Sequence, residues 1–330
     1  MNSLLSGAAL GAALTASGVF QPSVIVSQLK FENFHMIQAF LTAAAASTCI
    51  VTAAQSLGYL KLSPRSFSSV GLFAKWDGNV FGGMLLGTGM MLSGACPGTV
   101  LAQVGAGVRS GFYAFQGAVL AGIVWTGFLQ PYLSQTPKRL PQSSPEDKKF
   151  LTVYGTLGAS RTTALVGLEL MFAAIIGAAV SFTSLGPEAK ISPVVGGLCI
   201  GAAQLLSVVL RKSLVGTSTS YEEAGDWFLG VCRGNGGVPK RYNNMLFSAG
   251  MIAGAFALTR AVPVFGQVSP TTISPLNAGI GGFLMILGSR IAGGCTSGHG
   301  ISGLSLFSTS SFITIAATFG AGGFVGLLRG

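Results

Sequence analysis

Charged residues are scarce in this chain. Asp, Glu, Lys and Arg make up 8% of its 330 residues, whereas soluble domains carry about 25%. Half of the residues are hydrophobic and the mean hydropathy is +0.64. A soluble globular domain is therefore excluded, and most of the chain is predicted to lie in a lipid bilayer.

Several functional signatures are also missing. The sequence has no Walker A pattern, so we expect no ATP hydrolysis by this chain. Its five cysteines are an odd number without CxxC spacing, so neither a disulfide framework nor a zinc site is predicted. We expect no cofactor. The apolar segment Met1–Phe20 lacks a basic region before it and is interpreted as mature structure rather than as a cleaved signal.

Apolar segments that could cross a membrane recur along the whole chain. A spanning helix needs about 20 residues. Two shorter segments, Val80–Leu92 and Ala278–Ile291, each lead into a cysteine. The sequence predicts an all-α polytopic membrane protein with about nine spanning helices plus broken or re-entrant short helices. The longer candidate spans are Leu4–Phe20, Met36–Leu60, Gly111–Leu129, Thr162–Thr183, Pro193–Leu210, Met245–Thr259 and Phe312–Leu328.

The net charge of +10 comes mainly from loops such as the one with Lys61, Arg65 and Lys75. In a soluble protein this excess would suggest nucleic acid, but in a membrane protein we expect no nucleic-acid partner. Positive residues in loops set the orientation of spanning helices. They can also line a vestibule that concentrates an anion, and both explanations stay open.

The chain contains an internal duplication. The stretch from Gly82 to Cys96 aligns without a gap on Gly281 to Cys295, a shift of 199 residues that brings the two cysteines into register. Gly7 to Ala13 resembles Gly197 to Ala203, with the small-residue spacing that close helix approach in lipid requires. We predict two pseudo-symmetric transmembrane repeats, residues 1–129 and 162–330, joined by a polar, Pro-rich linker over residues 130–161.

Each cysteine interrupts a helix, which in lipid is tolerated only where the backbone is buried in protein or lines a cavity. Broken helices at corresponding points of two repeats indicate a transporter's binding site. Pro97 disfavours helix at Cys96, and free N–H groups of the helix that follows would face an anion. A thiol suits a soft sulfur atom. The predicted substrate path comprises Gly94, Cys96, Pro97, Gly98 and Thr99, together with Gly294, Cys295, Thr296, Ser297 and His299.

The other three cysteines are interpreted mainly as packing residues. Cys49 and Cys199 lie in apolar helical segments, where cysteine behaves as a small hydrophobe. Cys199 is kept as a secondary candidate for the path. Cys232 lies in a charged segment and is interpreted as incidental.

Charged residues near the loops are further candidates. Arg290 lies inside an apolar segment, where a charge is expensive and by default functional. It either binds an anion, reaches an interface, or pairs with Glu169, an acid within another apolar run. His299 either relays a proton, donates to an anion, or is a hydrogen-bonded structural group. Arg109 follows the first loop and lies either near its mouth or at the membrane interface.

Three stretches carry a resemblance to a known family. Gly288 to Gly303 reads almost throughout as the signature of the YeeE/YedE sulphur-transport family, and Gly94 to Gly98 matches the loop of the other half. Ala16 to Ile25 looks like the opening of half-size members, so the chain resembles two such halves fused. The resemblance implies a helical carrier whose short tilted helices meet centrally. It also implies thiosulfate transport between thiols, a role that carries over to Cys96 and Cys295.

The chain departs from that family at one point. Full-length members have a further cysteine near the N-terminal entrance, and the corresponding region around Ser17–Ser27 has none. The departure separates this chain from a three-thiol relay and leaves open whether thiosulfate or a related anion is the substrate.

The leading hypothesis is a transporter, not an enzyme, for thiosulfate or another small sulfur-containing anion. It would reside in the plasma or inner membrane, and a soluble sulfurtransferase is a possible partner. One alternative is a membrane sulfur-transfer protein that carries persulfide on Cys96 or Cys295. For this, a nucleophile needs an activating base, and His299 is the one base close in sequence. The other alternative is a general small-anion channel. A passive scaffold ranks last, because a scaffold has no need for helices that are interrupted at a cysteine.

Overall fold

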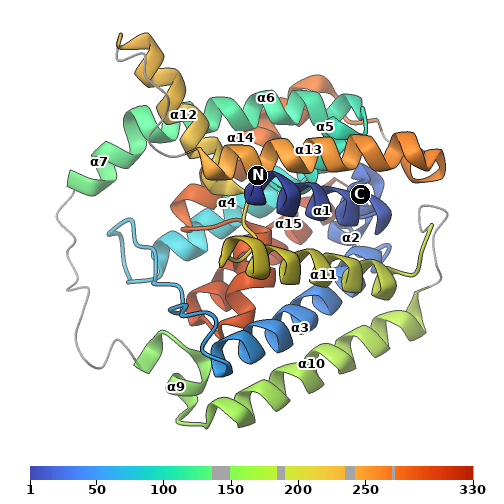
Figure 1. Cartoon of the computed structure of the whole chain (residues 1–330). Coiled ribbons are helices and arrows are strands. Elements are labelled where there is room, and N and C mark those ends of the chain that lie inside the picture. The colour runs from blue at the N-terminus through green and yellow to red at the C-terminus, as the bar shows by residue number, and fades with distance from the viewer. Residues whose placement is uncertain (136–148, 184–189, 235–241, 270–271, 330) are drawn as a thin grey trace.

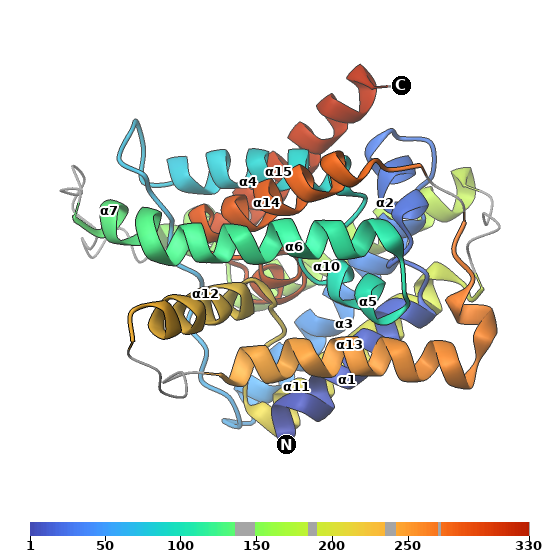
Figure 2. The ribbon, with the colours of Figure 1, turned by 90° about the horizontal axis from the view of Figure 1, so that it is seen from above.

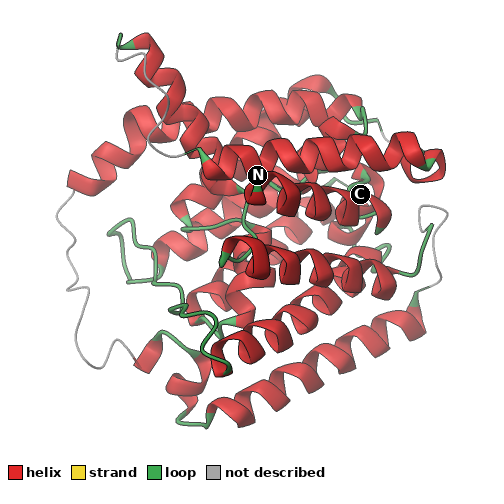
Figure 3. Ribbon diagram, in the orientation of Figure 1, coloured by secondary structure: helices red, strands yellow, loops and turns green. Residues whose placement is uncertain are grey.

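The computed structural model describes residues 1–330 except 136–148, 184–189, 235–241, 270–271 and 330 (Figure 1). Within these residues the regular elements are all helices (Figure 3), and one isolated antiparallel bridge joins Thr152 to Ser308. The predicted all-α class is confirmed for the part of the chain that the structure covers.

The first half contains three long helices that correspond to predicted spans and several short ones. The break at Ala16–Pro22 divides the first predicted span from a short helix, because Pro22 begins a new helix. The bounds are α1 (Asn2–Ala16), α2 (Pro22–Leu29), α3 (His35–Ser56), α4 (Asp77–Ser93), α5 (Thr99–Gly105), α6 (Arg109–Val124), the π-helical η1 (Trp125–Leu129) and α7 (Gln130–Gln135).

The second half follows the predicted spans and adds a helix that hydropathy did not indicate, α12. This helix carries Glu222, Glu223 and Asp226, so its composition is typical of a loop between spans. The bounds are α9 (Val153–Leu157), α10 (Arg161–Phe182), α11 (Pro193–Arg211), α12 (Ser218–Cys232), α13 (Asn243–Ala261), the 3-10 helix η2 (Pro263–Gly266), α14 (Pro275–Ile291), the π-helical η3 (Ser297–Gly303) and α15 (Thr309–Leu328).

The long helices form two groups that each mix the two halves of the chain. In one group α1 packs on α13 and α11, and α11 packs on α3; in the other α4 packs on α14 and α15, and α14 packs on α6. Figure 2 shows α4, α14 and α6 running together, with α13, α1 and α11 on the opposite side and the short α5 between α6 and α13. The centre of the molecule is therefore built by short elements held between two groups of long helices.

Glycine allows these helices to touch backbone to backbone. A Cβ atom on Gly7 or Gly11 of α1 would overlap a carbonyl oxygen of Phe247 or Met251 on α13. Along α4 and α14, Gly89 lies against the backbone of Gly281, so the two helices run antiparallel from there. Small residues of this kind substitute for the hydrophobic driving force that lipid removes between helices.

Five helical segments are long and apolar enough to cross a membrane among the residues described. They are His35–Ser56, Arg109–Leu133, Arg161–Phe182, Pro193–Arg211 and Thr309–Leu328. The prediction of about nine spans is not confirmed. The helices α4 and α14, which lead to the two cysteines, have 17 residues each, and at 1.5 Å per residue they fall short of a hydrocarbon core of about 30 Å.

The predicted linker over residues 130–161 is helical at its start. The helix of the first half continues through η1 and α7 to Gln135, beyond the expected end at Leu129. Residues 136–148 of the linker lie outside the described residues. At its far end Val153 donates to the carbonyl of Phe307 over 2.9 Å, so this part of the linker is joined to the C-terminal half.

The glycine contacts lead to a test with a matched control. In Gly282→Ala the new methyl group would overlap the carbonyl oxygen of Ala114, whereas a Cβ atom on Gly177 of α10 meets nothing within 4 Å. We expect Gly282→Ala to lower the free energy of unfolding by about 1–3 kcal/mol, the usual cost of overpacking. Gly177→Ala should leave it unchanged or raise it by up to about 1 kcal/mol. Thermal unfolding in detergent measures both, and equal midpoints would contradict the packing described.

Candidate functional site

Both helices that lead to the cysteines end at a glycine with left-handed backbone geometry. Gly94 ends α4 with φ of 59°, and Gly293 follows α14 with φ of 80°. Each lies two residues before its cysteine, and the same shift of 199 residues relates them. A left-handed residue at a helix C-terminus is usually glycine, because a Cβ atom is disfavoured there. The glycines thus turn the chain and bring the thiols inward.

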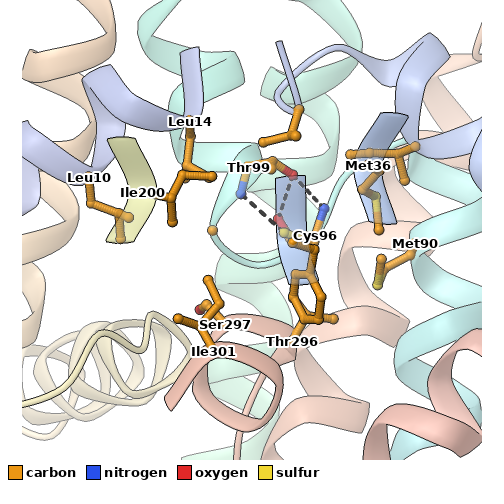
Figure 4. Close-up of a pocket in the computed structure, with 14 residues that line it drawn as sticks. Leu10, Leu14, Met36, Met90, Cys96, Thr99, Ile200, Thr296, Ser297 and Ile301 are labelled. Atoms are coloured by element: carbon orange, nitrogen blue, oxygen red, sulfur yellow. Dashed lines mark hydrogen bonds between the residues drawn. The ribbon is translucent and has the colours of Figure 1, made fainter. Parts of the chain in front are cut away.

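The Cys96 thiol is held against the first turn of α5. The backbone N–H of Thr99 donates to the sulfur over 3.3 Å, and the Thr99 hydroxyl accepts from the Cys96 N–H over 2.7 Å. Figure 4 shows both bonds between the two residues. The side chain of Cys96 is partly exposed. The sulfur's acceptor role is therefore occupied by the backbone, which leaves its hydrogen available to donate.

The Cys295 thiol is buried, at 1% exposure, and has more partners. Its sulfur lies 3.2 Å from the Ser297 hydroxyl oxygen and 3.5 Å from that of Thr217. The backbone N–H groups of Thr217 and Gly298 also point toward it. Gly298 stands three residues after Cys295, as Thr99 stands three after Cys96. In both loops the first turn of the next helix therefore donates to a thiol.

A cavity lies between the two loops. The centre of a water-sized sphere can occupy a volume of about 50 Å³ in this cavity. One water molecule needs roughly 10–15 Å³ by the same measure, so the cavity has room for more than one. Figure 4 shows Cys96, Thr296 and Ser297 facing it from the two loops, with Met36 and Met90 nearby. The buried Thr296 hydroxyl has no hydrogen-bond partner among the described residues. The lining residues are Leu10, Leu14, Val19, Ile25, Met36, Phe40, Met90, Cys96, Gly98, Thr99, Ile200, Thr296, Ser297 and Ile301.

The start of α12 joins the two loops, which the sequence did not indicate. Thr217 lies against the Cys295 sulfur, and a Cβ atom on Gly98 would lie 3.8 Å from the Thr217 side chain. The Tyr221 hydroxyl donates to the carbonyl of Pro97 over 3.1 Å. Tyr221 is 2% exposed. There was little indication in the sequence that these residues lie at the site, because α12 follows a polar segment and carries three acidic residues.

Arg290 pairs with Glu222 of α12, so the alternative pairing with Glu169 is wrong. The two side chains are 15% and 17% exposed, and the guanidinium carbon also lies 5.9 Å from the centre of the Trp125 ring. Glu169 instead accepts a contact from the Cys49 thiol at 3.7 Å. Much of the charge of Arg290 is thus compensated inside the protein.

His299 is held by hydrogen bonds at both ring nitrogens. Nδ1 lies 2.9 Å from the Ser311 hydroxyl and Nε2 lies 3.2 Å from the carbonyl oxygen of Ala292. A carbonyl only accepts, so Nε2 carries the hydrogen and Nδ1 accepts from Ser311. This arrangement is that of a structural group, and neither nitrogen contacts the Cys295 thiol. The persulfide alternative therefore lacks the base that proximity in sequence suggested.

The remaining candidates lie away from the cavity lining. Cys199 of α11 is partly buried and packs against the main hydrophobic core. Arg109 begins α6 and is exposed. Cys49 and Cys232 are exposed. In the described part of the chain, no group of three or more His, Cys, Asp or Glu residues is arranged to hold a metal ion.

Arg65 also lies beside the Cys295 loop, although in the sequence it could not be told apart from the other cations in loops. It lies in the segment between α3 and α4, and its Nη1 donates to the carbonyl oxygen of Gly293 over 3.0 Å. The sequence does not distinguish one loop arginine or lysine from another. Arg65 differs from the others because its segment crosses the end of α14.

Apolar helices around a small cavity are typical of an integral membrane protein. Cys96 lines this cavity together with Thr296 and Ser297, whereas the buried Cys295 is not part of its lining. The chain belongs to the sulphur-transport family, whose family model matches residues 16–325. This confirms the resemblance of the two cysteine loops to that family.

Individual relatives agree with this assignment. A protein named thiosulfate transporter TsuA, from Spirochaeta thermophila, is 24% identical over 325 residues, which covers 94% of this chain and 93% of the relative. Two probable transporters from Xylella fastidiosa are 29% and 27% identical over 124 residues. Each match covers 38% of this chain and 83% of the relative. The shorter relatives have the size expected of half-size members.

The ion pair of Arg290 and Glu222 can be tested with a double-mutant cycle. We expect Arg290→Gln and Glu222→Gln each to lower the free energy of unfolding by about 2–3 kcal/mol, less than the 3–5 kcal/mol typical of a fully buried pair. The double variant should lose less than the sum, because neither partner is left unpaired. Chemical denaturation in detergent measures the four proteins. Additive losses would mean that the pair contributes no coupling.

Proposed function

We propose that this protein carries thiosulfate, or a related small sulfur-containing anion, across a membrane along a path that passes Cys96 and Cys295. The observation that carries the proposal is the cavity, where Cys96 faces Thr296 and Ser297 from the loop of the second cysteine. The family assignment and the thiosulfate transporter among the relatives support it. We place the protein in the plasma or inner membrane, and a soluble sulfurtransferase partner stays a prediction.

The thiols are suited to donate to the terminal sulfur of the anion. A backbone N–H group already donates to the Cys96 sulfur, so the S–H hydrogen of Cys96 is left to bind a ligand. The Cys295 thiol also lies against the hydroxyls of Ser297 and Thr217, which would exchange partners with an arriving anion. A thiol is a weak donor, and a polarizable sulfur is a better match for it than a strongly hydrated oxygen. Because the contact at each of the two thiols is weak, the anion can bind there and dissociate again, as conduction requires.

We further infer that the two halves are repeats related by a pseudo-two-fold axis. In the two repeats α4 corresponds to α14, and α6 corresponds to α15. The packing of α4 on α15 is matched by the packing of α14 on α6, as expected if the repeats are related by such an axis. The contacts follow the same correspondence, since Gly83 lies against Thr314 and Gly282 against Ala114. Isologous contacts of this kind are what a two-fold axis requires. The antiparallel α4 and α14 favour an inverted repeat with the axis in the membrane plane.

The role of the thiols can be tested by uptake into proteoliposomes. We expect Cys96→Ala and Cys295→Ala each to reduce thiosulfate uptake by more than about tenfold, the effect of about 1.4 kcal/mol on a transport barrier. Alanine keeps the small volume but removes the donor. Cys49→Ala and Cys232→Ala are the controls, because both residues are exposed and away from the cavity. Normal uptake by both Cys96 and Cys295 variants would refute the thiol path.

Selectivity separates a thiol path from a general anion channel. Sulfate carries the same charge as thiosulfate but offers an oxygen where thiosulfate has its terminal sulfur. The thiols and apolar walls replace the water around that oxygen poorly. We therefore expect a hundredfold excess, roughly, of unlabelled sulfate to compete weakly with labelled thiosulfate. Cys96→Ser and Cys295→Ser should lose uptake although their size hardly changes. Strong competition by sulfate would favour the general channel.

A further inference from the structure

Arg65 is fixed by its backbone at the start of α15 and by its side chain at the Cys295 loop. Its N–H donates to the Ser308 hydroxyl over 2.8 Å, and its carbonyl accepts from the Ser310 hydroxyl over 3.2 Å. Ser308 precedes α15, and Ser310 lies in the first turn of that helix. The guanidinium then reaches the carbonyl of Gly293. The position of the cation relative to the loop is thus set by three hydrogen bonds.

Glycines allow the guanidinium of Arg65 to lie close to the Cys295 loop. A Cβ atom on Gly298 would lie 3.2 Å from Arg65 Nη2 and 3.6 Å from Cys295 Sγ, so these two atoms are at most 6.8 Å apart. A Cβ atom on Gly294 would lie 2.8 Å from Arg65 Nη1. The guanidinium and the thiol therefore both lie beside the same face of Gly298.

The charge of Arg65 is not compensated by a carboxylate among the described residues. Arg290, the other arginine near this loop, is paired with Glu222. Of the five N–H donors of a guanidinium, Arg65 directs one to the carbonyl of Gly293, and no other side-chain hydrogen bond of this residue is found in the described part of the chain. A cation with free donors beside a thiol is arranged to bind an anion.

We propose that Arg65 binds the oxygen end of the transported anion while Cys295 contacts its sulfur end. This assignment rests on the proposed function and names the residue that supplies the charge at the second thiol. An anion that leaves water loses strong hydration, which only a nearby opposite charge or good hydrogen bonds offset. A guanidinium is always charged and offers a planar fork to two oxygens.

The oxygen end and the sulfur end of thiosulfate call for different contacts. A cation alone would bind sulfate and thiosulfate alike, and a thiol alone would leave the negative charge without a partner. Arg65 and Cys295 together present one hard and one soft contact beside Gly298. Selection for an anion that has both kinds of atom follows from this pairing.

Uptake kinetics test the charge. We expect Arg65→Gln to raise the KM for thiosulfate by about tenfold or more, the usual effect of losing a charge-assisted hydrogen bond. Arg65→Lys should fall between this variant and the wild type, because lysine keeps the charge but not the fork. Lys61→Gln removes an exposed cation from the same segment and should leave KM unchanged. An unchanged KM in Arg65→Gln would overturn the proposal.

A second measurement does not depend on transport. In a variant whose only cysteine is Cys295, we would compare its rates of reaction with an anionic and a neutral methanethiosulfonate. Arg65→Gln should lower the ratio of anionic to neutral rates several-fold, since the cation concentrates negative reagents at the thiol; Lys61→Gln should not. An unchanged ratio overturns the role of Arg65. A change in this ratio without thiosulfate uptake by the wild type would refute the proposed function and keep the anion site.

If Arg65→Gln does not fold, Gly298→Ala replaces it in both measurements. The added methyl group would contact both the guanidinium and the thiol without removing the charge. We expect it to raise KM and to slow the anionic reagent more than the neutral one. Wild-type values in both measurements would overturn the proposal.

Discussion

Along the contact of α4 and α14, glycines place the backbone of one helix directly against the backbone of the other. Gly82 lies against the carbonyl of Gly288, and Gly89 against that of Gly281. No side chain could be inserted there without separating the helices. The two cysteine loops begin where these helices end, so their relative position is set by this contact. The cavity, the start of α12 and the turn that receives Arg65 are all arranged around it.

Much of the fold was predictable because long apolar runs leave a chain little choice but to form helices in lipid. The helices α3, α10, α11 and α15 lie close to their predicted spans. The prediction was less accurate where hydropathy is not decisive. A further short helix begins at Pro22, after the first predicted span, and α12 is helical although acids interrupt it. The number of spans could not be read from hydropathy, since helices that end inside the protein are as apolar as those that cross it.

The sequence identified the two cysteine loops because duplication and glycine are local signals. The partners of those loops are not local. Glu222 follows Tyr221 in a helix whose contacts depend on how α12 packs on α6 and α14. Arg65 could be distinguished from Lys61 only by the path of its segment across Gly293. Pairing of charges depends on tertiary structure, which is why the sequence could not indicate Glu222 as the partner of Arg290.

The start of α12 has a mechanical consequence. Thr217 lies at the Cys295 sulfur, and Tyr221 binds the carbonyl of Pro97 next to Cys96. The two residues are about one helical turn apart, and a helix does not stretch along its axis. A rotation that withdraws Thr217 from one thiol therefore displaces Tyr221 from the other loop. If the thiols bind the anion as proposed, this helix would link the two sites, so that occupancy of one would alter the geometry of the other, which is the basis of cooperativity between sites.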